Sequence, residues 1–478
     1  MANPTTGAPG APAGAESGEG PRLHRVLGLR DLVLLNVVAI TGLRWWLTSA
    51  GGYGYGALVL WCLALVCFFI PSGLAVIDLT SRFPDEGGIY AWTKRAFGDG
   101  HGFISGWCLW TNNLFYFPTL LVFVAGNLVF MLGPDWKSLE QSSLFMMTAS
   151  ILLFWLCVGM NIVGMRYGRW LNNFGALGTW IPATLLIVLG GYALVRFGSS
   201  TPLSAGGLVP VFTLGTVNFF SQICFGFSGL ELGSMMAGEI VEPRKNVPRA
   251  IIISGVIITG IYILGTGALL VALPQKDIGF LSGVAYAIAA VQHKAGLGFL
   301  AGASALLIGL GGLGGVSAWL AGSSRMPFVV GLDRYLPPAF GRLNRNGAPD
   351  VAIYVTAVVS TLLIVMSFSG ARVQEAYLTL ANFTIIVYFI PYLYMFAALV
   401  KLAVRPGETL PAGAIPVPGG RPGATVAGVV GLLTTAVAIV FAVFPAEGTA
   451  NPFLQVAKMV GGSVVMIVLG WVLYRRGL

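Results

Sequence analysis

Two ionisable side chains each interrupt a long apolar stretch of this sequence. Arg44 directly follows the residues ITGL, and Glu231 directly follows GFSGL. A charge inside an apolar run of membrane length is costly, so it normally faces protein or water rather than lipid. At such a depth a guanidinium group could hold a carboxylate, while a carboxyl group could bind an amine or carry a proton. We therefore take these two positions as the chemical centre of the chain.

Three roles are open for this couple. Arg44 and Glu231 could form a pair that acts in function, or Arg44 could hold a ligand carboxylate while Glu231 takes part in gating or proton coupling. The third role is a structural ion pair that never touches a ligand. Removing one partner of a buried pair costs about 3–5 kcal/mol, so a single mutant does not separate these roles. The fixed charge of Arg44 could also replace a bound sodium ion, which predicts sodium independence.

Small and polar residues precede both charges. They are Thr41 and Gly42 before the first charge, and Gly226, Ser228 and Gly229 before the second. Glycines in membrane helices often serve only close helix packing. Beside a charge at membrane depth, however, this pattern is typical of a helix that unwinds locally, and broken membrane helices form the binding sites of many transporters.

Each predicted break would expose backbone groups. Half-helices that end near Ile40 and Gly226 would offer free carbonyl groups to an ammonium ion. A half-helix that begins near Arg44 would offer free N–H groups and its positive dipole end to a carboxylate. The backbone could therefore recognise the head group of an amino acid, leaving side chains to select among substrates.

The composition is that of a polytopic membrane protein. The chain has 478 residues, of which 56% are hydrophobic and only 9% charged, whereas soluble domains carry roughly a quarter charged residues. The basic residues are scattered through short loops, which excludes a nucleic-acid surface. The five cysteines lie within apolar runs without a CxxC motif, and the three histidines fall at span edges or in loops. We expect no metal site and no cofactor.

Twelve apolar runs are long enough to span a membrane. They cover residues 31–54, 56–81, 101–132, 143–163, 171–196, 213–238, 249–272, 298–324, 350–369, 376–400, 425–445 and 453–474. With the N-terminus inside, 20 of the 27 Lys and Arg residues fall in cytoplasmic segments, six fall outside, and Arg44 remains within a span. This bias predicts that both termini are cytoplasmic.

Two shorter segments indicate an internal repeat. Residues 85–98 follow the second span on the inside, and residues 276–294 follow the seventh on the outside. Equivalent segments on opposite faces predict an inverted repeat of five spans plus five. The predicted parts are a disordered cytoplasmic tail over 1–26, a first repeat over 27–197, a second over 198–403, a Pro/Gly-rich linker over 404–423 and two further spans over 424–478.

Several motifs resemble the amino acid–polyamine–organocation (APC) superfamily of transporters. The most specific are FGFSGLE at 225–231 and EPRKNVPRA at 242–250, followed by FPDEGGIYAW at 83–92 and the segment from LPP at 336–338 to GAP at 347–349. The resemblance covers the chain from about residue 27 to the twelfth span. The Ile70-Pro71 pair and the LRWW stretch look most similar to the glutamate/γ-aminobutyrate antiporter-like permeases.

The resemblance implies an all-α polytopic membrane protein of LeuT-like fold, with 12 transmembrane helices, a 5+5 inverted repeat and broken helices 1 and 6. It implies a substrate site between the two breaks. Its residues would be Ile40, Thr41, Gly42, Leu43, Arg44, Asn113, Phe225, Gly226, Phe227, Ser228, Gly229, Ser317 and Asn382. Gating or coupling would involve Glu231, Arg44, Phe225 and Tyr116. Many members have a glycine-rich first break, and Arg44 departs from that pattern. Trp319 is expected to be a core residue rather than part of the site.

These features together predict a secondary active amino acid transporter, either a permease or an antiporter, in the cell inner membrane. Spans 1, 2, 6 and 7 would rock against spans 3–5 and 8–10 to give alternating access. The partners would be a small-molecule substrate, namely an amino acid or related amine, the lipid bilayer and, where uptake is proton-coupled rather than by exchange, protons. No nucleic acid is expected as a partner. The alternatives are a polyamine or amine carrier, which Arg44 disfavours, and a non-transporting amino acid sensor. A membrane enzyme would need a clustered set of catalytic groups, which the chain does not offer.

Overall fold

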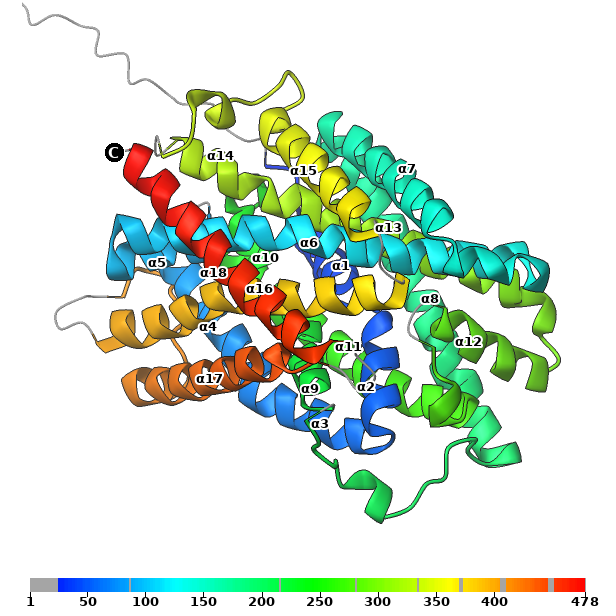
Figure 1. Ribbon diagram of the computed structural model, residues 1–478. Coiled ribbons are helices and arrows are strands. Elements are labelled where there is room, and N and C mark those ends of the chain that lie inside the picture. Colours follow the sequence, from blue (N-terminus) through cyan, green and yellow to red (C-terminus); the bar gives the residue numbers. More distant parts are fainter. Residues whose placement is uncertain are drawn as a thin grey trace, which may run out of the picture.

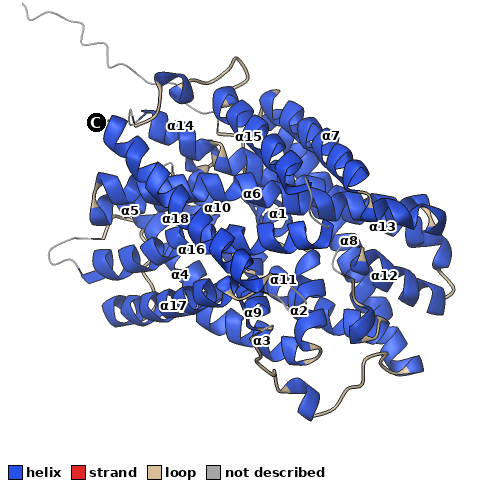
Figure 2. Ribbon diagram, viewed as in Figure 1, coloured by secondary structure: helices blue, strands red, loops and turns tan. Residues whose placement is uncertain are grey.

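The computed structural model describes residues 25–85, 87–214, 216–279, 282–332, 335–368, 373–404, 410–445 and 451–477. Within these ranges every named element is a helix, and the only β-bridge is an isolated one between Leu27 and Ile240. Figure 2 shows this all-helical architecture. Nearly all of the predicted tail over residues 1–26, and the part of the predicted linker at 405–409, lie outside the described residues.

Each of the twelve predicted apolar segments contains a helix or a pair of helices. In chain order these are α1 (Leu29–Ile40) with α2 (Arg44–Tyr53), α3 (Gly56–Ala64) with α4 (Ile70–Arg82), α6 (Asp99–Leu132), α7 (Ser143–Ile162), α8 (Met165–Phe197), α9 (Val217–Gly226) with α10 (Leu232–Met235), α11 (Pro243–Ala272), α13 (Ala301–Ser323), α15 (Asp350–Phe368), α16 (Val373–Val404), α17 (Gly420–Val443) and α18 (Pro452–Gly477). The shorter helices α5 (Ile89–Phe97), α12 (Gly283–Lys294) and α14 (Arg325–Leu332) lie between them.

Among the described residues, nine helices are long and apolar enough to cross a membrane, and the bent pair α1–α2 would make a tenth. Residues 350–366 of α15 form a shorter apolar helix. The helices α9 and α10 are each short, because the chain is interrupted between them. The all-helical membrane fold is confirmed, whereas the count of twelve spans and the inverted repeat stay predictions.

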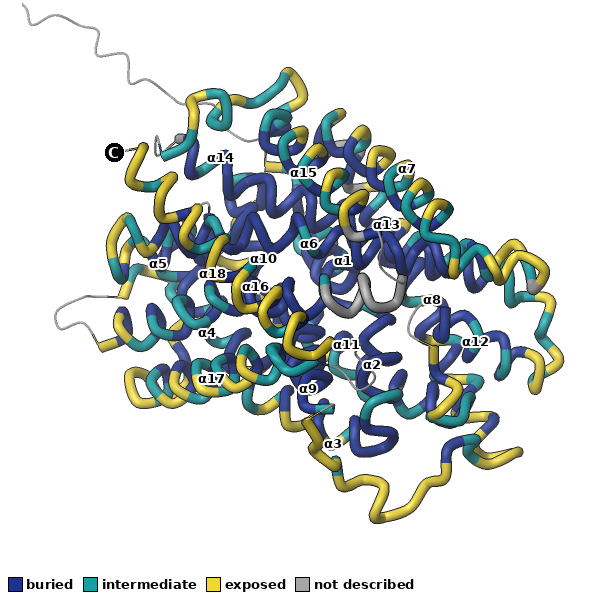
Figure 3. The backbone as a smooth tube through the Cα atoms, viewed as in Figure 1, coloured by how far each residue is buried: buried dark blue, intermediate teal, exposed yellow. Residues whose placement is uncertain are grey.

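The surface of the helix bundle is strongly apolar. Large hydrophobic side chains are exposed along several outer helices, for example Val195 at 86% and Phe453 at 84%. Figure 3 shows this exposed layer on α18 and the buried elements at the centre of the molecule. Such a surface suits lipid contact, and because helices satisfy their own backbone hydrogen bonds they can be surrounded by hydrocarbon. The chain is therefore an integral membrane protein.

The short interrupted helices lie at the centre of the bundle. The α1 helix packs against α8, α11 and α13, and α2 packs against α9 and α11. The α10 helix packs against α1 and α13, while α16 contacts both α6 and α9. In Figure 1 the long helices α6 and α16 cross the middle of the molecule. The interrupted helices are thus held by long continuous ones.

Glycines allow two of these long helices to touch. A Cβ atom added to Gly175 of α8 would lie 2.5 Å from the Cα atom of Gly314 in α13, and one added to Gly178 would lie 2.4 Å from the carbonyl oxygen of Leu307. Both distances are far below any real contact between carbon and a backbone atom. The backbones of α8 and α13 therefore approach closely, as small residues permit in membrane helices.

The C-terminal end of α4 carries an ion pair that is largely buried rather than exposed on the surface. Asp78 and Arg82 pair at 2.7 Å, and the Asp78 side chain is only 1% exposed. Its carboxylate also accepts a hydrogen bond from the backbone N–H of Val417 at 2.9 Å, and Ser81 accepts one from the N–H of Ile415. The segment that leads into α17 covers this end of α4, which explains the burial.

Candidate functional site

The first predicted break lies at the junction of α1 and α2. The α1 helix ends at Ile40, α2 begins at Arg44, and their axes differ by 43°. The intervening residues Thr41, Gly42 and Leu43 do not continue the helix of α1. Polar and small residues at this point thus coincide with an interruption of the helix.

The second break separates α9, which ends at Gly226, from α10, which begins at Leu232. Gly229 has a φ of +120°, a conformation that L side chains rarely adopt. A Cβ atom there would also lie 2.9 Å from Cγ1 of Ile40 and 3.0 Å from the ring of Trp319. A glycine is therefore required for both conformation and space, and it brings the second break against the first.

A single tyrosine hydroxyl joins the two breaks. The Tyr262 Oη atom of α11 lies 2.6 Å from the carbonyl oxygen of Ile40 and 2.9 Å from that of Gly226. It also accepts a hydrogen bond from the backbone N–H of Gly42 at 3.1 Å. The groups released at the end of α1 and at the end of α9 thus converge on one oxygen atom.

Arg44 is a buried cation without a hydrogen-bonding partner. Its side chain is among the largest that are fully buried, and none of its three guanidinium nitrogens has a partner within the described structure. Its guanidinium carbon lies 4.3 Å from the ring centroid of Trp45 and 4.9 Å from that of Tyr116, distances typical of cation–π contacts. The rings stabilise the charge, but they leave every N–H group available to an anion.

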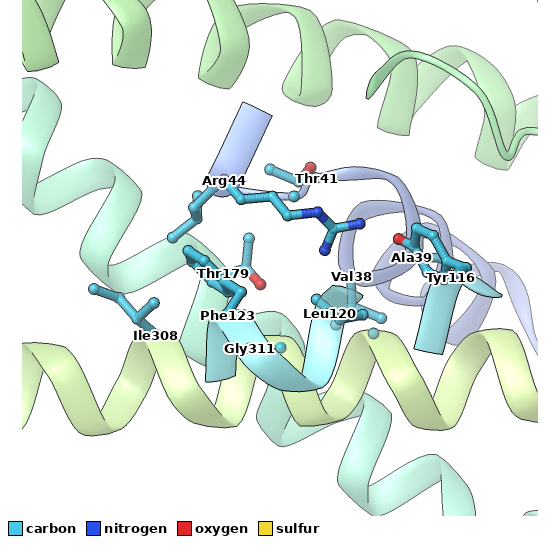
Figure 4. A pocket seen from close by; sticks show the side chains of 14 residues that line it. Val38, Ala39, Thr41, Arg44, Tyr116, Leu120, Phe123, Thr179, Ile308 and Gly311 are labelled. Carbon is cyan, nitrogen blue, oxygen red and sulfur yellow. The ribbon is translucent and has the colours of Figure 1, made fainter. Parts of the chain in front are cut away.

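The guanidinium reaches into a small cavity of about 20 Å³, which is room for about one water molecule. The cavity is lined by the first break together with residues of α6, α8 and α13, including Leu120, Thr179 and Gly311. Figure 4 shows the Arg44 side chain extending into the space bounded by Thr41, Leu120 and Tyr116. The hydroxyl of Thr41 is also buried and without a partner, so two kinds of donor lie beside the cavity.

Glu231 is held by a different set of groups. The hydroxyls of Tyr388 and Tyr392 in α16 each donate to one of its two carboxylate oxygens. The Tyr392 oxygen in turn accepts a hydrogen bond from the N–H of Gly229 at 2.9 Å. In the described chain, Arg44 and Glu231 do not form an ion pair with each other. The two charges engage different helices, so the structure does not form the ion pair considered from the sequence.

Five aromatic rings from five helices surround the meeting point of the breaks. Phe225 lies 5.4 Å from Trp45, 5.9 Å from Tyr116 and 5.2 Å from Tyr388, measured between ring centroids. Trp319 closes the set, at 5.8 Å from both Tyr116 and Tyr388. We call these five residues the aromatic cluster. Phe225 and Tyr116, which the sequence predicted as gating residues, both belong to it.

The break residues and Arg44 lie close together, whereas three polar residues predicted for the site bond to neighbouring helices or to their own helix. Asn113 donates to the carbonyl of Leu109 in its own helix, and Ser317 accepts from Asn161 at 3.0 Å. Asn382 accepts from Gln222 at 3.3 Å, which links α16 to α9. None of the three lines the cavity beside Arg44. The side chain of Thr379, three residues before Asn382 in the same helix, lies outside the described residues.

The remaining break residues pack inward. Phe227 is fully buried, stacks on Phe69 at 4.6 Å and lies edge-on to Trp61 at 5.0 Å. The hydroxyl of Ser228 donates to the carbonyl of Phe225 within the same break, and Leu43 is buried at 4% exposure.

Sequence reasoning missed several residues that contact the breaks. Tyr262, Tyr388 and Tyr392 lie within apolar runs, where a tyrosine reads as a packed aromatic. Trp319, expected to be core, donates from its indole nitrogen to the carbonyl of Ala39 at 2.8 Å. The four-residue spacing of Tyr388 and Tyr392 does place both hydroxyls on one helix face, and that signal could have been used.

The comparisons with known proteins agree with this architecture. The family model described as amino acid permease matches residues 27–470. The chain belongs to this amino acid permease family. An uncharacterized transporter of Legionella pneumophila is 29% identical over 456 residues, which is 95% of this chain and 97% of that protein.

Two further relatives of the family come from Lactococcus lactis. A probable agmatine/putrescine antiporter is 22% identical and covers 93% of this chain and 94% of its own length. A glutamate/γ-aminobutyrate antiporter is 24% identical, and the match covers 85% of this chain and 82% of that protein. These family and relative names describe transporters rather than enzymes. The predicted superfamily and the similarity to glutamate/γ-aminobutyrate antiporters are confirmed.

Among solved structures, the chain is similar to MhsT in complex with L-phenylalanine. The TM-score is 0.59 at 14% identity, over 95% of this chain and all of that one. At this level of identity the likeness concerns the fold alone, and it supports the predicted LeuT-like arrangement.

Proposed function

We propose that this permease is a secondary active transporter of amino acids that works by alternating access, with the substrate bound between the two helix breaks. The observation that carries the proposal is the buried, unpartnered guanidinium of Arg44 at the edge of the first break. A buried cation without an anion is costly, and a substrate carboxylate would pair with it at low cost in desolvation. The aromatic cluster would then enclose the rest of the substrate.

The two ends of an amino acid match the two kinds of group at the breaks. The carboxylate would bind the guanidinium of Arg44 and the hydroxyl of Thr41. The ammonium group would bind the carbonyls at the ends of α1 and α9, where the helix dipoles are negative. A polyamine has no carboxylate, so Arg44 would repel it. This favours amino acids over amines, although the relatives named above include an agmatine/putrescine antiporter.

Movement is needed for binding. The cavity of about 20 Å³ is too small for an amino acid, so entry would require the aromatic cluster or the helices around it to separate. We propose that α1–α4 and α9–α11 move together against α6–α8 and α13–α16. Glu231, held by tyrosines of α16 on the other side of that boundary, would act in gating or proton coupling.

We further propose that transport is independent of sodium, because Arg44 supplies a fixed positive charge. We also propose that the protein lies in the inner membrane with both termini cytoplasmic.

Counterflow in proteoliposomes tests the proposal. Vesicles loaded with one unlabelled amino acid or amine would be diluted into its labelled form, in sodium or choline buffer, with and without a proton gradient. We expect labelled amino acid to accumulate transiently in both buffers, and amines to accumulate less. Accumulation of amines alone would favour the amine carrier. Binding measured by thermal stabilisation without any flux would favour a sensor and contradict transport.

A further inference from the structure

Tyr262 is fixed in place by the rings around it. It is fully buried, its ring stacks on Trp61 with centroids 4.3 Å apart and planes 9° apart, and Phe227 meets it edge-on at 5.3 Å. Trp61 is itself anchored, since its indole nitrogen donates to the hydroxyl of Ser49 at 3.2 Å. These contacts aim the Tyr262 hydroxyl at the two breaks and leave its ring little freedom to turn.

The hydroxyl meets three backbone groups with a single proton. It accepts from the N–H of Gly42, and it can donate to the carbonyl of Ile40 or to that of Gly226, but to only one at a time. In a membrane interior, backbone groups without partners cost several kcal/mol each, because no water replaces the missing bond. This one side chain therefore supplies a donor to the Gly226 carbonyl from within the protein, while the Ile40 carbonyl also accepts a hydrogen bond from the backbone N–H of Gly42 at 2.8 Å.

The same two carbonyls are the proposed acceptors for the substrate ammonium. We propose that Tyr262 is a positioning residue that takes the place of this ammonium when the carrier returns without substrate. With substrate bound, the ammonium supplies the donors. Without substrate, the Tyr262 hydroxyl supplies one, so the breaks can close away from water. This inference rests on the proposed transport function, and it concerns the unloaded half of the cycle.

The consequence is a difference between two fluxes. Exchange requires only loaded transitions, whereas net efflux into substrate-free buffer requires the unloaded carrier to return. Removing the hydroxyl should slow net efflux and spare exchange. The loss of one hydrogen bond to a buried group corresponds to about a tenfold decrease in the rate of net efflux.

The experiment compares Tyr262→Phe with the unchanged protein in vesicles loaded with a counterflow substrate. Net efflux is measured into substrate-free buffer, and exchange into buffer containing the unlabelled substrate. Tyr53→Phe is the matched control. The Tyr53 hydroxyl donates to the carbonyl of Thr216 at 2.6 Å. Like Tyr262, it joins two segments of the chain, here the first predicted span and the segment before α9, but it lies away from the breaks. The control should lower neither flux by more than about twofold.

Each outcome decides between the alternatives. A selective loss of net efflux in Tyr262→Phe supports the proposal. Equal loss of both fluxes would reduce Tyr262 to a structural residue, and unchanged fluxes would exclude it from the cycle. Should Tyr262→Phe fail to fold, the unchanged protein still tests the idea, because exchange without measurable net efflux would overturn it. Absence of exchange in the unchanged protein would instead contradict the proposed function.

Discussion

At the scale of single residues, Arg44 combines a full charge with almost complete burial. Two aromatic faces at 4.3 and 4.9 Å offset part of the cost of its desolvation. Aromatic rings cannot accept hydrogen bonds as strongly as a carboxylate does, so the guanidinium keeps its capacity for a planar, bidentate anion. A lysine would lose that geometry while keeping the charge.

This difference gives a graded prediction. Arg44→Lys should weaken the binding of a carboxylate substrate by about tenfold, and Arg44→Gln by about a hundredfold, because a hydrogen bond to a charged group contributes about 1.5–3 kcal/mol. Substrate affinity is measured by thermal stabilisation or by competition in counterflow. For the corresponding amine without a carboxylate, Arg44→Gln should bind no worse than the unchanged protein. A parallel loss for both ligands would mean that Arg44 acts only in structure.

The sequence identified the breaks but not their tyrosine partners. Gly229 could be predicted because a glycine beside a charge at membrane depth has a conformational reason to be there. Tyr262 could not, since a tyrosine in an apolar span looks the same whether its hydroxyl meets a lipid head group or a helix end. The direction in which the Arg44 side chain points could not be predicted from the sequence either. The sequence gives its depth, whereas the turn between α1 and α2 decides which neighbouring helix it faces.

At the scale of elements, a buried ion pair ties the segment after α10 to α14. Arg325 donates to Glu239 at 2.6 Å, with side chains 3% and 4% exposed. The backbone carbonyl of Glu239 also accepts from the N–H groups of Val26 and Leu27, just before α1. The two broken spans are thus fastened together at the end of the molecule where α1 begins.

Removing one member of this pair should be costly. Arg325→Met leaves a buried carboxylate without its cation, and we expect it to lower the free energy of unfolding by about 3–5 kcal/mol. Adding Glu239→Gln should recover part of that loss, because the unpaired charge is removed. Thermal or denaturant unfolding in detergent measures both. A double variant that is less stable than Arg325→Met alone would contradict this account of the pair.

The contact between α8 and α13 makes a second prediction about elements. Gly175→Ala would place a methyl group against the backbone of Gly314, so the helices must move apart, at a cost of about 1–3 kcal/mol. Gly191→Ala is the control in the same helix, since nothing lies within 4 Å of its added Cβ atom. Unfolding temperatures of the two variants give the comparison, and equal values would argue against close packing at Gly175.

At the scale of the whole molecule, the charge bias in the loops predicts the orientation in the membrane. Two exposed loop residues, Ser204 before α9 and Asn346 before α15, should lie on opposite faces. Ser204→Cys is expected to react with a membrane-impermeant thiol reagent on intact cells, and Asn346→Cys only after permeabilisation. The chain without added cysteine provides the background. The reverse pattern would invert the proposed topology, and labelling of both from outside would require a different number of spans.

Asp78 binds the segment that leads into α17, and so gives that segment a part in the fold. The chain that leads into α17 supplies an N–H group to this buried carboxylate, and Ser81 beside it bonds to the same segment. A version of the protein that ended after α16 would therefore expose the Asp78 carboxylate at the C-terminal end of α4. It would also remove the backbone N–H group that this carboxylate binds. Any attempt to shorten this transporter by removing α17 and α18 would have to redesign that corner first, for example with a neutral residue in place of Asp78.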